Sequence, residues 1–184
     1  MANLTGSPVV SAHPTSEVST TPYPHAPGTK MRDESNGNEY TYCDFTATVY
    51  SGVTVGITKD FTAAPLSEQH QGPVGVTVTS GTSDNAGWVQ TFGKHSGAQL
   101  ASGSSDVTSA MVAIVASSVS SPNVGFNAVA RTTIDYYTIN GMWVMGAAST
   151  ATTSGTSHTG AEVEVFMMDP SCNPVVSGVN DPTS

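Results

Sequence analysis

Valine outnumbers leucine by 22 to three, and this imbalance constrains the fold of the 184-residue chain more than any other feature. β-Branched side chains favour extended backbone, whereas helices are built mainly from straight-chain residues. Serine and threonine supply a further 24 and 25 residues, while only 10% of all residues are charged. The composition therefore excludes a coiled coil or a charged helical bundle and predicts an all-β protein.

Apolar and polar residues alternate with a period of two along several segments, as in strands with one buried face. These segments cover residues 42–50, 53–58, 74–79 and 163–167. In the first of them, Cys43 and Phe45 fall on the apolar face, and Tyr42 falls on the more polar face. The run 111–116 is continuously apolar, which favours a strand buried on both faces.

The remaining segments complete a predicted set of about eight to ten short strands, typical of a compact antiparallel β-barrel or sandwich. We expect a strand at 88–92 that Gly93 closes, a strand within 124–133, and a loop over 59–73. Asn140-Gly141 separates two apolar runs and predicts a tight β-hairpin, because both positions of a type I′ turn need positive φ.

Proline divides the chain into three parts. Residues 1–28 contain five of the eleven prolines and no apolar period, which predicts an extended N-terminal arm. Residues 29–170 form the predicted β domain, whose last strand Pro170 ends, and residues 171–184 form a polar tail. The arm carries isolated apolar residues that cannot pack upon one another, so ordering it requires a partner. These candidate anchors are Leu4, Val9, Val10, Val18 and Tyr23.

The net charge of −9 excludes two classes of partner. The five basic residues are scattered, and nucleic acids and anionic membranes both require a basic face. No apolar run approaches the ~18 residues of a membrane span, and the N-terminus lacks the basic and apolar regions of a signal peptide. We therefore expect synthesis in the cytosol and release only by lysis.

No catalytic or metal-binding motif stands out, so we expect neither an enzyme nor a cofactor. The serines lack a G-x-S-x-G elbow, and no histidine lies two to four residues from another histidine or cysteine. Glu162 and Glu164 have the spacing of a carboxylate pair, but they alternate with valine and are interpreted as the solvent face of a strand.

Four further residues have two interpretations each. Cys43 and Cys172, 129 positions apart, are interpreted as buried free thiols, with a disulfide as the alternative. Trp88 and Trp143 each precede a valine and are interpreted as core or rim anchors. An exposed tryptophan in a sugar-binding groove is the alternative, although neither residue has aromatic neighbours in the sequence.

Two short motifs carry a resemblance to a known family. They are Gly37-Asn38-Glu39-Tyr40-Thr41-Tyr42 and Ala86-Gly87-Trp88-Val89-Gln90-Thr91-Phe92-Gly93, preceded by the proline-rich start. Over residues 27–100 the chain resembles capsid decoration (cement) and minor head proteins of tailed bacteriophages. The resemblance implies a β-rich fold, often trimeric, bound to the outside of the capsid lattice, and it implies no catalytic residues.

The expected function is therefore that of a structural virion protein, made in the host cytoplasm, which binds the capsid exterior and reinforces it. Its expected partners are the major capsid protein, contacted through the arm, and further copies of itself in a trimer. Few lysines protect the strand edges, so the edges need to be hidden. The expected oligomer interface contains Met111, Ile114, Met142 and Trp143. The alternative is a carbohydrate- or surface-binding β module, such as a head-fibre or adhesin-like domain; a small hydrolase ranks third.

Overall fold

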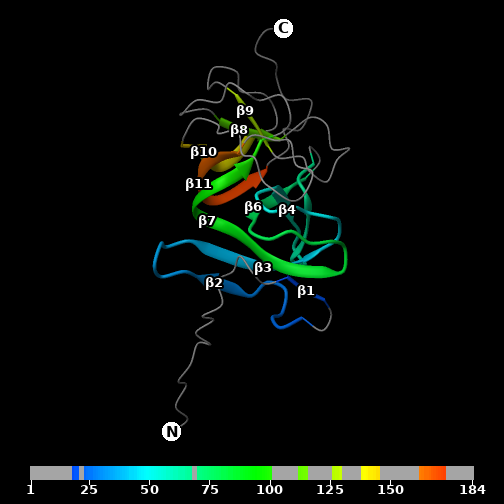
Figure 1. The fold of residues 1–184 in the computed structure, drawn as a ribbon. Helices are drawn as coiled ribbons and strands as arrows, with labels where there is room; N and C mark the ends of the chain where they lie inside the picture. Colours follow the sequence, from blue (N-terminus) through cyan, green and yellow to red (C-terminus); the bar gives the residue numbers. More distant parts are fainter. Residues whose placement is uncertain are drawn as a thin grey trace.

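The computed structural model describes residues 18–20, 23–67, 70–100, 112–115, 126–129, 138–145 and 162–172. This part of the chain is all-β, with eleven strands and no helix (Figure 1). The strands are β1 (Val18–Thr20), β2 (Lys30–Arg32), β3 (Glu39–Phe45), β4 (Thr54–Ile57), β5 (Thr62–Pro65), β6 (Gly72–Thr77), β7 (Asn85–Gln99), β8 (Val112–Val115), β9 (Phe126–Val129), β10 (Thr138–Val144) and β11 (Glu162–Cys172). The predicted all-β fold is confirmed.

Five strands close into a small barrel. β7 pairs with β3, β3 with β5, β5 with β4, β4 with β6, and β6 again with β7. The β3–β5 pair is parallel and the other described strand pairs are antiparallel. The barrel encloses the cluster Cys43, Phe45, Val49, Val55, Ile57, Ala63 and Val89. The loop expected over 59–73 was wrong, because β5 and the start of β6 lie within it.

β7 is the longest described strand, with 15 residues, and it runs from the barrel to the strands β10 and β11 (Figure 1). Its first part pairs with β3 and its second part with β11. The expectation that Gly93 ends this strand was wrong. Gly93 has a φ of +94°, and the strand changes partner there without stopping. The Asn38 side chain bridges this position, since its Oδ1 accepts from Lys94 N at 3.0 Å and its Nδ2 donates to Lys94 O at 3.1 Å.

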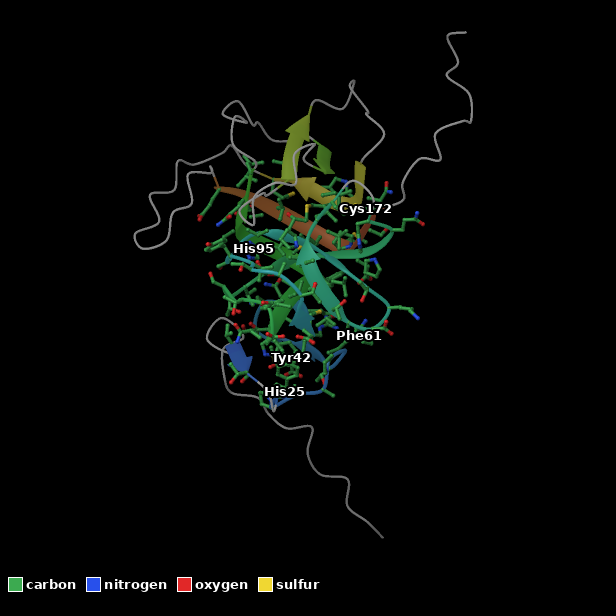
Figure 2. All side chains as sticks on the ribbon, turned by 90° about the vertical axis from the view of Figure 1, so that its right-hand side faces the viewer. His25, Tyr42, Phe61, His95 and Cys172 are labelled. Atoms are coloured by element: carbon green, nitrogen blue, oxygen red, sulfur yellow. The ribbon has the colours of Figure 1, made fainter. Side chains whose placement is uncertain are left out.

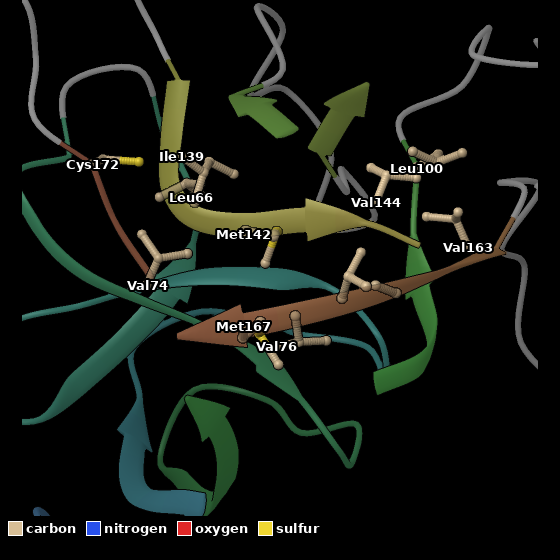
Figure 3. Packing of buried hydrophobic residues seen from close by; sticks show 12 residues of the cluster. Leu66, Val74, Val76, Leu100, Ile139, Met142, Val144, Val163, Met167 and Cys172 are labelled. Atoms are coloured by element: carbon tan, nitrogen blue, oxygen red, sulfur yellow. The ribbon is translucent and has the colours of Figure 1, made fainter. Parts of the chain in front are cut away.

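A second core lies between β6, β7, β10 and β11 (Figure 3). β11 supplies Val163, Val165 and Met167, whose alternation was predicted and is confirmed. The other members of this cluster are Leu66, Val74, Val76, Ala98, Leu100, Ile139, Met142, Val144 and Cys172. β8 continues the sheet beyond β10, so the predicted strand within 111–116 is confirmed.

The predicted hairpin at Asn140-Gly141 was wrong. Both residues lie inside β10, which pairs with β11 on either side of them. Only Gly141 has positive φ, +78°, and the register shifts there because three residues of β11 face one residue of β10. A type I′ turn needs two positive φ values, whereas a bulge accommodates a single glycine with positive φ. Pro170 lies in this irregular part of β11 and does not end the strand, which continues to Cys172.

A third cluster lies on the outer face of β3 and β7, under the N-terminal segment. Tyr40, Tyr42, Ala86 and Trp88 are buried there, and Tyr23 and Met31 pack against them. β3 is thus buried on both faces, so the half-buried pattern expected around Tyr42 was wrong. The N-terminal segment covers the second face, because β1 pairs with β7 and the Tyr23 ring packs against Tyr42. His25 also reaches Tyr42 (Figure 2).

Candidate functional site

Three aromatic side chains form a row across three adjacent strands. Phe92 on β7, Phe166 on β11 and Trp143 on β10 lie with ring centroids 6.2 Å (Phe92–Phe166) and 6.5 Å (Phe166–Trp143) apart. Trp143 is 44% exposed, and Met145 and Met168 beside the row are 51% and 53% exposed. These five residues are called the aromatic face below. Exposed large apolar side chains gathered on one face are a sign of an interaction surface.

The strand register explains how residues far apart in sequence meet on this face. Phe166 of β11 lies opposite Trp143 of β10 and opposite Lys94 of β7, while Met168 lies opposite Phe92. Side chains directly opposite one another on antiparallel strands share a face. Because strand residues alternate between faces, Val165 and Met167 point into the core and leave Phe166 and Met168 outside.

An ion pair lies next to the aromatic face. Lys94 Nζ lies 2.8 Å from Glu164 Oε2, and both side chains are partly exposed. Glu162 and Glu164 belong to the outward face of β11, which confirms the interpretation of these carboxylates as solvent-facing. Lys94 thus neutralises the charge of Glu164 next to the apolar centre of the aromatic face.

The four residues expected at an oligomer interface occupy different environments in the structure. Trp143 is exposed, but Met142 is buried at 2% and belongs to the core, because neighbouring residues of a strand point to opposite faces. Ile114 lies in β8 and pairs with Thr138 of β10. Met111 lies outside the described residues. The role of Trp143 in an interface stays a prediction.

The expected arm residues divide in a similar way. Leu4, Val9 and Val10 lie outside the described residues. Val18 lies in β1, opposite Gly87 of β7, and is 39% exposed. Tyr23 is partly buried against the third cluster. The described part of the arm, residues 18–20 and 23–28, therefore contacts the β domain of its own chain.

The titratable groups with perturbed pKa values are buried or half-buried. Burial raises the pKa of the Cys43 thiol to about 12, with a smaller contribution from Asp44, and burial raises that of Cys172 to about 11. Both cysteines are buried and free, which confirms their interpretation as thiols. Desolvation lowers the pKa of His95 to about 4, so this ring is neutral at pH 7. Among the described residues, no group of three or more His, Cys, Asp or Glu side chains is arranged to hold a metal ion.

Sequence reasoning missed the aromatic face because its members lie up to 76 positions apart, from Phe92 to Met168. The sequence signal for this face was the pair Phe166 and Met168. These apolar residues stand at outward positions of β11, where polar residues otherwise alternate with the buried side chains. Comparison with models of protein families, with characterised proteins and with solved structures found no match to this chain. In the part of the chain that the structure describes, no helix is long and apolar enough to cross a membrane.

Proposed function

We propose that the protein is a structural virion protein that attaches to the exterior of a phage capsid through its aromatic face and reinforces the lattice. The observation that carries the proposal is the exposed row of Trp143, Phe166 and Phe92, flanked by Met145 and Met168. Aromatic residues and methionine are enriched at the centres of protein–protein interfaces, where lysine and glutamate are depleted.

The composition of the face favours a protein surface as its partner. Methionine side chains are flexible and polarisable, so they adapt to an irregular apolar surface. Trp143 has the size and exposure of a binding hot spot, and such residues carry most of the affinity of an interface. Many identical copies on a lattice also make individually weak contacts effective when they are linked. The assignment of the lattice to a phage capsid depends on the resemblance in residues 27–100.

The test is binding to capsids produced from the same genome with this gene deleted. Purified protein is mixed with these capsids, and the bound fraction is measured by sedimentation. Trp143→Ala should weaken binding about 30-fold or more, the effect of losing a hot spot of ~2 kcal/mol. Phe61→Ala is the matched control, because Phe61 is a similarly exposed aromatic residue, at 38%, outside the aromatic face. Equal binding by the two variants would count against the proposal.

A carbohydrate ligand is the second candidate, and the exposed Trp143 ring beside Phe166 is the observation that favours it. Sugars need polar groups next to the aromatic surface, but the neighbours here are two methionines and an ion pair that is already formed. Titration with oligosaccharides, followed by tryptophan fluorescence, separates the two functions. A sugar-specific change that Trp143→Phe abolishes would favour the carbohydrate function, since Trp88 is buried and remains as the internal reference.

A further inference from the structure

The described part of the N-terminal strap, residues 18–20 and 23–28, occupies an aromatic site on the outer face of β3 and β7 (Figure 2). Tyr23 and His25 are partly buried, whereas the proline between them is exposed. The His25 ring centroid lies 5.3 Å from those of both Tyr42 and Trp88. The Tyr23 centroid lies 6.4 Å from that of Tyr42. The strap therefore places alternate side chains on an aromatic surface of the domain.

Polar contacts fix the position of the strap on this site. Tyr23 Oη donates a 2.8 Å hydrogen bond to the Asp44 carboxylate. β1 pairs with the first residues of β7, so that Val18 to Thr20 lie opposite Gly87 to Asn85. The site thus combines a strand edge, a carboxylate and an aromatic surface. These features fit an extended peptide that contains proline and tyrosine, since prolines fix φ before binding and lower the entropic cost.

A tight turn returns the strap to its own domain. Thr29 N donates to Ala26 O at 3.0 Å, and Gly28 within the turn has a φ of +90°. A Cβ atom at Gly28 would lie 2.5 Å from the Phe61 ring, so the closed turn requires glycine. If the turn opens, the same strap reaches outward and leaves its site free for another strap.

We propose that the strap site also binds the strap of a second copy of this chain, so that two copies exchange their straps. The contacts that β1, Tyr23 and His25 make with the site are kept in the exchanged pair. The turn changes conformation, and the hydrogen bond from Gly28 N to Tyr42 O is lost with it. β1 lies at the end of the strand order with three residue pairs, so it is among the easiest strands to release. The proposal is independent of the aromatic face, and its failure would leave the proposed function untouched.

The experiment uses full-length chains with single engineered cysteines. Thr20→Cys on the strap and Asn85→Cys on β7 are Cα partners in the β1–β7 ladder. A chain that carries both should form the disulfide within itself, which checks the register. In a mixture of the two single variants, a heterodimeric disulfide in excess of random collision forms when one strap lies on the other chain's site. The native thiols do not compete, because both are buried. Ser96→Cys, exposed on the same strand, replaces Asn85→Cys to measure disulfides from random collision.

The expected result is a heterodimer whose yield rises with protein concentration and exceeds that of the Ser96→Cys control. Gly28→Ala in both chains disfavours the closed turn. It should lower the concentration needed for half-maximal exchange at least about tenfold, because left-handed backbone is strained for alanine and not for glycine. A mixture that gives no more heterodimer than the control up to millimolar concentration overturns the proposal. So does a yield that Gly28→Ala leaves unchanged, or a double-cysteine chain that forms no internal disulfide.

Discussion

Substitution of Gly93 by alanine tests the strand continuity that builds the aromatic face. Gly93 lies where β7 passes from β3 to β11, and a Cβ atom there would clash with Asn38 Oδ1. The left-handed backbone would cost alanine about 1–2 kcal/mol of stability. It would also displace the two hydrogen bonds between Asn38 and Lys94, which are worth about 1 kcal/mol each.

The expected loss is therefore about 3–4 kcal/mol, a large part of the ~5–15 kcal/mol that stabilises an ordinary domain. Urea unfolding measures it: with an m-value of about 2 kcal/mol/M, the midpoint falls by about 1.5–2 M. Gly37→Ala is the matched control, because Gly37 also has positive φ, +77°, but no atom lies within 4 Å of its Cβ position. That variant should lose only the backbone strain, about 1–2 kcal/mol.

Equal losses in the two variants would refute the role assigned to Asn38. A double-mutant cycle adds a second check, since Asn38→Ala removes the clash that Gly93→Ala creates. The two substitutions together should cost clearly less than the sum of the single losses. Additive losses would mean that the Asn38 side chain does not hold β7 at this position.

Tyr23→Phe removes the hydrogen bond to the β3 carboxylate and should cost about 1–2 kcal/mol in urea unfolding. His95→Gln should reduce the loss of stability on acidification. The His95 ring has a pKa of about 4 in the folded protein and about 6.5 in the unfolded chain, so the unfolded chain takes up the proton first as the pH falls. Protonation of His95 therefore lowers the free energy of unfolding by up to about 3 kcal/mol between about pH 6.5 and pH 4. Cys43 and Cys172 should not react with a thiol reagent at pH 8 until the protein unfolds, because burial raises both pKa values. Deletion of residues 2–27 should lower the unfolding midpoint and increase tryptophan exposure, whereas deletion of residues 2–17 removes none of the described contacts.

Local periodicity was sufficient for the strands that have one buried face. Val163, Val165 and Met167 alternate with outward residues, and the structure buries them as predicted. Periodicity failed where a strand is covered on both sides. Tyr42 was assigned to a polar face because its neighbours on that face are polar, but the N-terminal strap buries it. The strap that buries Tyr42 comes from another part of the chain, so the sequence of the strand itself does not indicate that this face is buried.

Glycine was the second source of error. Gly93 was interpreted as the end of a strand and Gly141 as part of a hairpin turn, yet both have positive φ within a continuing strand. A single left-handed residue fits a bulge as well as a turn, so the partner strand decides between them. The aromatic face was also missed because it depends on the partner strands. Its three rings meet through the registers of β10 with β11 and of β11 with β7. Register is a property of paired strands and not of either sequence alone.

Methionine footprinting on decorated capsids tests the binding role of the aromatic face most directly. Met145 and Met168 are about half exposed, whereas Met142 on β10 and Met167 on β11 are buried at 2% and 0% and serve as internal references. In the free protein, dilute peroxide should oxidise the first pair to the sulfoxide and spare the second, as measured by mass spectrometry. On the capsid, Met145 and Met168 should become protected while the references do not change. Undiminished oxidation of Met145 and Met168 on fully decorated capsids would contradict the proposed attachment.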